Sequence, residues 1–284
     1  MEGQEKRPKV LAHRGDMESG PENTLTALNG AVKKGADGVE IDIRMTKDGK
    51  IVVFHDVEIG RMAPDFPGSL KSGKIRELTW DELKQVSLPF EGHLLGAFPE
   101  GGYKDERECF LPENLVGEGD TRKEQILLFD EFLDWLTSQK TGFIAEVEYK
   151  AEGMMDEVMR LIEAHKAAGR CILFSGETEL NREIQEWCRK NGKPDGLRLG
   201  ANIRYLCRET MNEIRDYDLW EVGLNAWAFQ QHEAEYLNSK GITVFSNLGD
   251  TPSWWERMTN LHVAAFKTNC PGPYREWRMG RYGE

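Results

Sequence analysis

A single (β/α)8 barrel of the TIM type is the fold that this sequence predicts, and three observations predict it. The chain has 284 residues, 39% of them hydrophobic, which suffices for one large core. Short β-branched runs alternate with amphipathic stretches, a pattern typical of a mostly parallel sheet. There are about eight such runs, and a parallel sheet of that size closes naturally into a barrel. We therefore expect residues 1–284 to form one domain.

Eight short segments are rich in β-branched and aromatic residues and are expected to be strands. The expected strands are residues 10–13, 39–43, 51–55, 143–149, 171–175, 197–201, 242–246 and 264–268.

Helical periodicity fills the spaces between most of these strands. The first expected helix is residues 24–34, which Asn23 or Thr24 can cap and which Gly35 stops. Another expected helix starts with Thr251 as its cap and Pro252 at its first position, a favoured combination. The remaining expected helices are residues 153–168, 179–190, 209–216 and 231–239.

The segment 56–125 breaks this alternation because it is rich in glycine, proline and charge. It contains one clear helix, residues 79–86, where Thr79 and Glu82 form a capping box. We expect a small inserted subdomain after the third strand, folded over the barrel mouth. Its apolar side chains are expected to wall a pocket there; these are Phe66, Leu70, Phe90, Leu94, Leu95 and Phe98.

The amino-acid composition limits which binding partners and which cellular compartment are expected. The net charge of -12 and the pI of about 5.2 argue against binding to nucleic acid or anionic membranes. Five scattered cysteines without a CxxC pair argue against a disulfide framework and suit a reducing compartment. No apolar run is long enough to span a bilayer, and residues 1–9 do not resemble a signal peptide. A cytoplasmic protein is expected, with a secreted form that has lost its leader as the alternative.

Charged side chains interrupt the otherwise apolar sequence of two expected strands. Glu40 and Asp42 are two apart and share one face, as do Glu146, Glu148 and Lys150. An unpaired charge facing the barrel interior would cost several kcal/mol, so these carboxylates are expected to share a cation. Carboxylate oxygens favour Mg²⁺ or Ca²⁺ over zinc. The sequence therefore predicts a divalent metal site.

Two histidines stand at strand ends and suit acid–base chemistry on a phosphodiester. His13 closes the first expected strand and His55 the third. An imidazole with a pKa of about 6.5 can serve as acid or base near neutral pH. The neighbouring Arg14 favours a neutral ring and a base role for His13, whereas Asp56 favours an imidazolium and an acid role for His55. Arg14 also offers a bidentate fork to phosphate.

The pair Asp48-Gly49 is a strong signal for a two-residue hairpin turn. Such a turn would pair Lys47 with Lys50 and Asp42 with His55, which would place a histidine beside a metal ligand. A hairpin is antiparallel, however, whereas a regular barrel requires a crossover at this point. A wider loop would loosen the pairing and still leave His55 at a strand end.

These residues give the chain a resemblance to the glycerophosphodiester phosphodiesterase family. The match is dense from Val10 to Asp56, resumes in three short stretches, and is thin beyond Lys150. The motifs that carry it are His13-Arg14-Gly15, Pro21-Glu22-Asn23-Thr24, the stretch 35–42 ending in Glu40-Ile41-Asp42, Thr46-Lys47-Asp48-Gly49, Val52-Val53-Phe54-His55-Asp56, the stretches 78–83 and 128–133, and Glu146-Val147-Glu148-Tyr149-Lys150.

The resemblance implies an acid–base pair, ligands for a divalent ion, and cationic contacts to phosphate. In that order, the implied residues are His13 and His55, then Glu40, Asp42 and Glu148, then Arg14 and Lys150. Glu22 is implied to lie near the metal or one layer behind it.

Three positions depart from the family pattern. Glu146 stands where the family often has asparagine, and Asn247 follows a strand after which the family often has tryptophan. The late Thr-Asp-x-Pro motif is Thr268-Asn269-Cys270-Pro271 in this chain. The last two differences concern the wall of the substrate pocket.

The resulting hypothesis is metal-dependent hydrolysis of a glycerophosphodiester to an alcohol and glycerol phosphate. One alternative is a phospholipase D-like lyase that forms a cyclic phosphate, which the long insertion disfavours. The other is a non-catalytic barrel that binds a phosphodiester, which the complete residue set disfavours. The expected partner is a small-molecule glycerophosphodiester or lysophospholipid. The head group, the choice between Mg²⁺ and Ca²⁺, and the oligomeric state are left open.

Overall fold

Eight parallel strands form a closed barrel in the computed structural model, which describes residues 7–63, 65–66, 73–90 and 121–283. The barrel closes because β1 pairs in parallel with both β2 and β12. This confirms the predicted TIM-like fold. In spatial order the barrel strands are β1 (Lys9–His13), β2 (Gly38–Met45), β7 (Ile144–Tyr149), β8 (Cys171–Phe174), β9 (Arg198–Arg204), β10 (Glu221–Leu224), β11 (Thr243–Ser246) and β12 (Ala265–Thr268).

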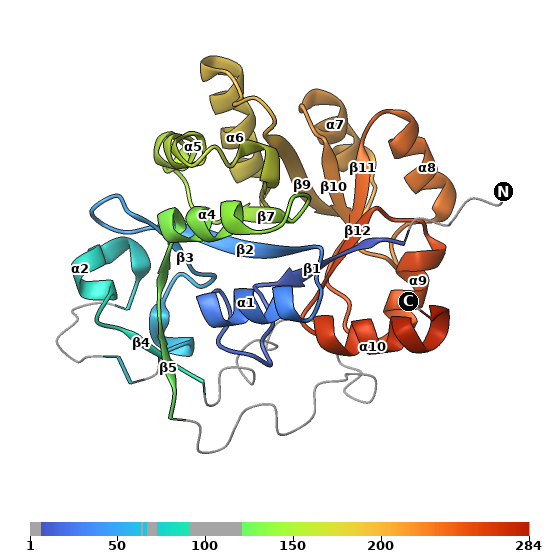
Figure 1. Cartoon of the computed structure of the whole chain (residues 1–284). Helices are drawn as coiled ribbons and strands as arrows, with labels where there is room; N and C mark the ends of the chain where they lie inside the picture. The colour runs from blue at the N-terminus through green and yellow to red at the C-terminus, as the bar shows by residue number, and fades with distance from the viewer. Residues whose placement is uncertain (1–6, 64, 67–72, 91–120, 284) are drawn as a thin grey trace.

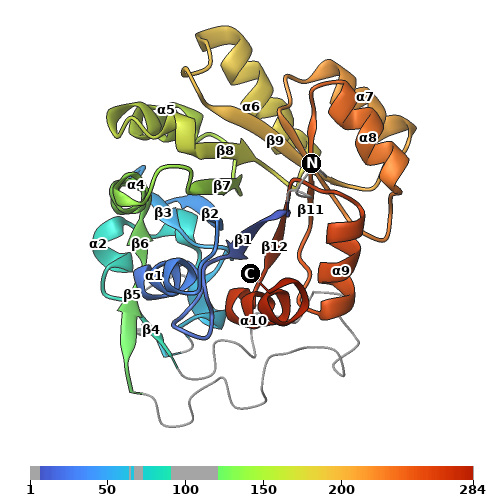
Figure 2. The ribbon, with the colours of Figure 1, turned by 45° about the vertical axis from the view of Figure 1, so that its right-hand side comes forward.

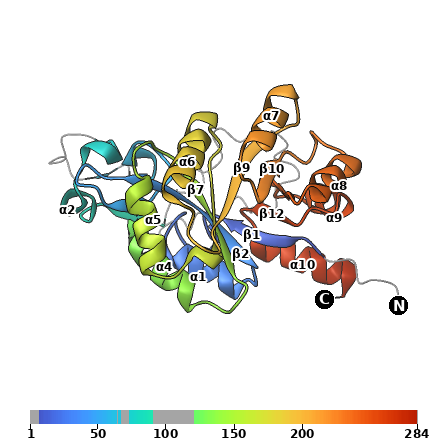
Figure 3. The ribbon, with the colours of Figure 1, turned by 90° about the horizontal axis from the view of Figure 1, so that it is seen from above.

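Helices surround the barrel and connect its successive strands (Figures 1 and 2). Seen from above, α8 and α9 lie on the side opposite α2 (Figure 3). The outer helices are α1 (Leu25–Lys33), α4 (Phe129–Ser138), α5 (Met155–Ala164), α6 (Thr178–Asn191), α7 (Arg208–Asp216), α8 (Gln231–Ser239), α9 (Pro252–Asn260) and α10 (Pro271–Tyr282).

The predicted caps of two outer helices are confirmed. The Thr24 side chain accepts a hydrogen bond from the Ala27 amide at the start of α1. Thr251 caps α9 in the same way, and Pro252 occupies the first position. The helices α4 and α10 were not predicted. Within the described residues, no helix has both the length and the apolar character needed to cross a bilayer.

One strand assignment was wrong. The segment β3 (Ile51–Val53) is antiparallel to β2 and to β6 (Leu127–Leu128), so it lies beside the barrel and is not one of its eight strands. The missing barrel strand is β10, which the sequence did not indicate because it is short and contains a charged residue and a glycine. Its Glu221 points toward Gly200, where an added Cβ would lie 2.0 Å from the carboxylate.

The predicted hairpin exists, but its register differs by one residue. Arg44 pairs with Val52 and Met45 with Ile51, and the Phe54 amide donates to the Asp42 carbonyl. The connection has three residues rather than two, with Gly49 at φ 81°. A glycine with positive φ is what a three-residue hairpin with a bulge requires. The sequence signal located the turn but not its length.

The described part of the insertion has a small core of its own. It contains α2 (Trp80–Leu83), with the predicted Thr79–Glu82 capping box, and a two-stranded sheet of β4 (Ser87–Pro89) and β5 (Lys123–Gln125). The buried side chains of this part form a hydrophobic cluster, which also includes Phe54 after β3. Phe66 packs against the cluster, and the predicted wall residues Leu70, Leu94, Leu95 and Phe98 lie outside the described residues.

Candidate active site

The parallel register of the barrel brings the predicted site residues together. His13 is aligned with Glu40 across β1 and β2. Asp42 is aligned with Glu148 across β2 and β7, and Lys150 follows the end of β7. All of them therefore lie toward the carboxyl ends of neighbouring strands, which is where TIM barrels hold their active sites.

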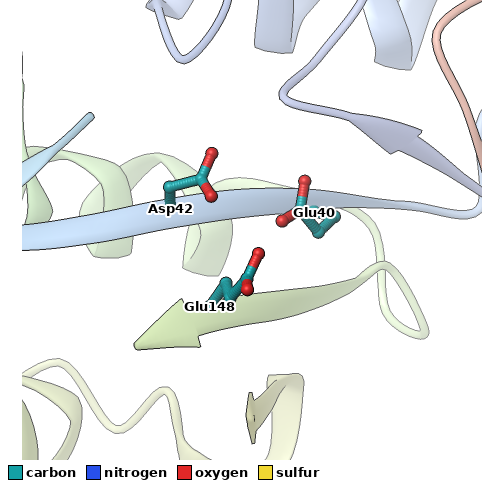
Figure 4. A group of neighbouring side chains, drawn as sticks. All are labelled: Glu40, Asp42 and Glu148. Carbon is teal, nitrogen blue, oxygen red and sulfur yellow. The ribbon is translucent and has the colours of Figure 1, made fainter. Parts of the chain in front are cut away.

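Glu40, Asp42 and Glu148 form an acidic group in which one ligand oxygen from each lies within 4.8 Å of the others. Figure 4 shows Glu40 and Asp42 on β2, with the Glu148 carboxylate reaching across from β7. Glu40 and Asp42 are 1% and 0% exposed, respectively. Three carboxylates at this separation repel one another strongly unless a cation lies between them.

The chemistry of this group fits a divalent cation. Burial, and then the charges of Asp42 and Glu148, raises the pKa of Glu40 well above its usual range. The Oδ1 atom of Asp42 is buried and accepts no hydrogen bond; it forms an ion pair with Lys150 Nζ, at 3.4 Å. A hard cation would satisfy this oxygen and offset the burial and the repulsion that raise the pKa of Glu40.

Arg14 and Lys150 place positive charge beside the acidic group. Arg14 Nε lies 3.2 Å from Asp42 Oδ2, and Lys150 Nζ lies 3.0 Å from Glu148 Oε2. Burial alone would raise the pKa of Asp42, but these two cations outweigh it and hold that pKa far below its usual value. Asn23 adds a hydrogen bond of 3.0 Å to Asp42 Oδ2. Asp42 therefore stays ionised.

Local backbone geometry explains how Arg14 turns toward the site. Arg14 and Gly15 have positive φ values of 57° and 92°. A Cβ on Gly15 would lie 2.8 Å from backbone and side-chain atoms of Ala27 in α1. The glycine is therefore required for the loop after β1 to pass against that helix.

Glu22 lies one layer behind the acidic group. It accepts hydrogen bonds from Arg14 at 3.1 Å and from Arg61 at 2.6 and 3.0 Å. Arg61 belongs to the insertion, and it also pairs with Asp56. The described part of the insertion thus contacts the surroundings of the site, a link that the sequence did not predict.

The two histidines have different partners. His13 Nδ1 lies 2.7 Å from Asn269 Oδ1 and its Nε2 lies 3.8 Å from Glu40 Oε2. Burial, followed by the charge of Arg14, lowers the pKa of His13 well below 6.5. His55 follows β3, and its Nδ1 lies 2.6 Å from Asp56 Oδ1. The His13 ring therefore contacts a neutral amide, and the His55 ring contacts a carboxylate.

Glu146 is not a member of the acidic group, in contrast to the expectation from sequence that it shares a cation with the other carboxylates. Its oxygens accept hydrogen bonds of 2.9 and 3.0 Å from Lys267 Nζ on β12. Burial alone would lower the pKa of Lys267, but Glu146 and Glu221 raise it instead. The extra negative charge at Glu146 thus has a partner inside the barrel.

Lys267→Met is expected to lower the free energy of unfolding by about 3–5 kcal/mol, because it leaves Glu146 buried without its partner. Denaturant unfolding measures this difference. The matched control is the double variant Glu146→Gln/Lys267→Met, which removes both charges and is expected to recover most of the loss. A single variant as stable as the wild type would show that the pair is energetically unimportant.

The sequence did not identify several residues that lie near the site. Lys267 carried a signal, because it is a lone charge in an apolar strand. Asn269 was noted only as a motif difference, and the links from Asp250 to Asn269 and from Arg61 to Glu22 had no local signal. Asn202 and Asn247 also approach Gly223 at the barrel mouth, where an added Cβ would lie 3.3 and 3.1 Å from their Oδ1 atoms.

Comparison with protein families identifies a family that this chain matches. The model of the glycerophosphoryl diester phosphodiesterase family matches residues 13–176, which include every site residue described above from His13 to Lys150. A glycerophosphodiester phosphodiesterase from Bacillus altitudinis is 29% identical over 172 residues, covering 59% of this chain and 57% of that protein. The chain spans about half the length of the curated relatives it matches.

Solved structures match the whole barrel. A protein from Silicibacter pomeroyi DSS-3 superposes with a TM-score of 0.78 at 15% identity, covering 98% of this chain and 95% of that one. An Oleispira antarctica phosphodiesterase, solved in complex with the product sn-glycerol-3-phosphate, gives a TM-score of 0.70 at 19% identity. That match covers 95% of this chain and 96% of the other. At these identities the likeness supports the fold alone.

Proposed function

The chain belongs to the glycerophosphoryl diester phosphodiesterase family, and we propose from this premise that it hydrolyses a glycerophosphodiester to an alcohol and glycerol phosphate. The observation that carries the proposal is the acidic group of Glu40, Asp42 and Glu148, which has a histidine and a cationic side chain beside it. The bound product in the Oleispira antarctica structure supports glycerol phosphate as the product class.

In this proposal Glu40, Asp42 and Glu148 hold a divalent cation, Mg²⁺ or Ca²⁺. When bound, the ion stabilises negative charge that develops on the non-bridging oxygens of the phosphodiester. The support is the all-carboxylate donor set, together with the buried Asp42 oxygen that accepts no hydrogen bond. Arg14 and Lys150 orient the phosphate from the two sides of the group, Arg14 by a fork of donors and Lys150 as a point charge.

Two histidines move the protons. His13 Nε2 faces the acidic group and takes a proton from the attacking water as a new P–O bond forms. His55 gives a proton to the departing alkoxide as the old P–O bond breaks, because an alkoxide is a very poor leaving group without it. Glu22 binds both Arg14 and Arg61 and so keeps the phosphate-binding arginine in place.

The product distinguishes this reaction from the lyase alternative. Purified protein is incubated with a glycerophosphodiester in H₂¹⁸O, and the product is examined by phosphorus NMR and mass spectrometry. We expect glycerol phosphate with one labelled oxygen. A cyclic phosphate without label would instead identify a lyase, and binding without turnover would identify a non-catalytic barrel.

We also propose that the segment 56–125 lies over the barrel mouth and sets the head-group preference. The support is the contact of Arg61 with Glu22, which joins this segment to the residues around Arg14. The family's substrates differ in the group beyond the phosphate, and a segment at the mouth is well placed to select it.

Replacing residues 92–119 by a short linker is expected to change the ranking of glycerophosphodiester substrates without unfolding the barrel. A short linker can join the two ends because β4 and β5, which flank the replaced residues, pair with each other. The Phe90 amide also donates to the Arg122 carbonyl, at 3.2 Å. Relative kcat/KM over a panel of head groups is the measurement, with the melting temperature as the control for folding. Intact activity with an unchanged ranking would contradict this role.

A further inference from the structure

Asn269 forms a buried hydrogen-bonded pair with Asp250 directly beside His13. It follows β12, which pairs with β1 so that Thr268 is aligned with Ala12. Asn269 Nδ2 donates to Asp250 Oδ2 at 2.7 Å, and the Asn269 backbone amide donates to Asp250 Oδ1 at 2.7 Å. Both side chains are at most 3% exposed.

These contacts determine which way the Asn269 amide faces. An ionised carboxylate only accepts hydrogen bonds, so the NH₂ group of the amide must point to Asp250. Burial raises the pKa of Asp250, and the hydrogen bonds from the Asn269 backbone, the Asn269 side chain and Thr268 (2.9 Å) oppose that shift by stabilising the ionised form. The amide oxygen is therefore directed at His13, 2.7 Å from Nδ1.

The orientation of the amide in turn determines where the His13 ring carries its proton. An amide oxygen only accepts, so His13 must donate from Nδ1. In the neutral ring the lone pair is then on Nε2, the nitrogen that lies 3.8 Å from Glu40 Oε2. A base that acts in the acidic group needs its lone pair on that nitrogen, and the opposite tautomer would present an N–H there.

We propose that Asp250 and Asn269 together are a positioning device that holds neutral His13 in its Nδ1–H form, with the Nε2 lone pair facing the reaction site. The inference rests on the proposed function for its catalytic consequence. It adds Asp250, in the loop between β11 and α9, and Asn269, directly after β12, and both lie beyond the segment that the family model matches. Asn269 acts through His13 and is not itself a catalytic residue.

The partner of His13 also differs in charge from that of His55. His13 donates to a neutral amide, with the carboxylate of Asp250 one residue further away, whereas His55 contacts the Asp56 carboxylate directly. A neutral acceptor fixes the tautomer without adding a full negative charge beside the ring. Asn269 stands where the glycerophosphodiester phosphodiesterase family has aspartate. The neutral partner of His13 is therefore a feature of this chain.

The direct test is long-range ¹H–¹⁵N NMR of the wild-type protein labelled at histidine, at a pH where the His13 ring is neutral. It is recorded without metal and again with Mg²⁺. We expect a protonated Nδ1 and an unprotonated Nε2 for His13 in both samples. His55 and His165, which contacts Asp130 and Asp134 on α4, serve as reference signals. An Nε2–H form, or averaging between the two forms, would overturn the proposal.

Variants connect the tautomer to turnover. Asn269→Leu removes the acceptor, so we expect mixed tautomers at His13, unchanged His55 signals, and a kcat about 10- to 100-fold lower with KM nearly unchanged. The exchanged pair Asp250→Asn/Asn269→Asp keeps the net charge and an acceptor at position 269. It is expected to restore the Nδ1–H form and most of kcat.

The outcomes of this experiment separate the two proposals. Normal kcat in Asn269→Leu with mixed tautomers would overturn the positioning role. If Asn269→Leu fails to fold by circular dichroism, the wild-type spectrum still decides the tautomer. A wild-type protein that has the Nδ1–H form but hydrolyses no glycerophosphodiester would contradict the proposed function and not the hydrogen-bond assignment.

Discussion

Removal of divalent cations is expected to abolish hydrolysis of a glycerophosphodiester and to lower the melting temperature. A divalent cation between Glu40, Asp42 and Glu148 would stabilise their carboxylates beyond what the neighbouring Arg14 and Lys150 provide. An ion present at about 100 times its Kd would stabilise the native state by about 2.7 kcal/mol. Turnover and thermal unfolding are measured after chelation and again after adding back Mg²⁺ or Ca²⁺.

A pair of matched variants tests whether the effect belongs to this group. Glu148→Gln removes a proposed ligand, so the melting temperature should no longer respond to added metal. Glu152→Gln makes the same chemical change at an exposed position shortly after β7, and its response to metal should equal that of the wild type. Full activity in a sample verified to be metal-free would rule out metal dependence.

The second large effect is expected from the histidines, whose variants should differ in their response to the leaving group. His13→Ala and His55→Ala should each reduce kcat on a natural diester by about 10²–10⁴-fold. With a p-nitrophenyl diester, His55→Ala should recover much of this loss, because p-nitrophenolate departs without a proton. His13→Ala should recover little, since the attacking water still lacks its base.

The assignment of base and acid rests on the surroundings of the two rings. Burial and then Arg14 lower the pKa of His13, which keeps it neutral and able to accept a proton at neutral pH. His165→Ala is the matched control, because this histidine, at the end of α5, contacts Asp130 and Asp134 on α4 and should not affect catalysis. Rescue of His13→Ala instead would reverse the roles. If neither variant loses activity on the natural diester, the catalytic proposal is wrong.

Local patterns predicted the elements of the fold. The alternation of apolar and polar residues located seven of the eight barrel strands, and the caps at Thr24, Thr79 and Thr251 located three helix starts. These signals succeed because a cap or a strand face depends on residues a few positions apart. The strand β10 was missed because its glutamate is accommodated by Gly200 on the neighbouring strand, and that glycine gives no sign of the contact in sequence.

Period-two spacing also predicted that Glu40 and Asp42 share a face and that Glu148 faces the same interior. It predicted equally that Glu146 would join them, since Glu146 and Glu148 are two apart as well. The difference lies in the partner that each carboxylate meets across the barrel. Glu146 is aligned with Glu40 but meets Lys267, 121 positions away in the sequence, whereas Glu148 is aligned with Asp42.

The sequence by itself therefore determined the barrel class, the helix caps and the identity of the acidic residues that face one interior. The tertiary structure alone decided which strands are neighbours, which cation each carboxylate meets, and which partner orients His13. That partner, Asn269, lies 256 positions away. The reason is physical: spacing along one strand fixes the face of a side chain, but its neighbours depend on the register between strands, which only closure of the barrel through β1, β2 and β12 establishes.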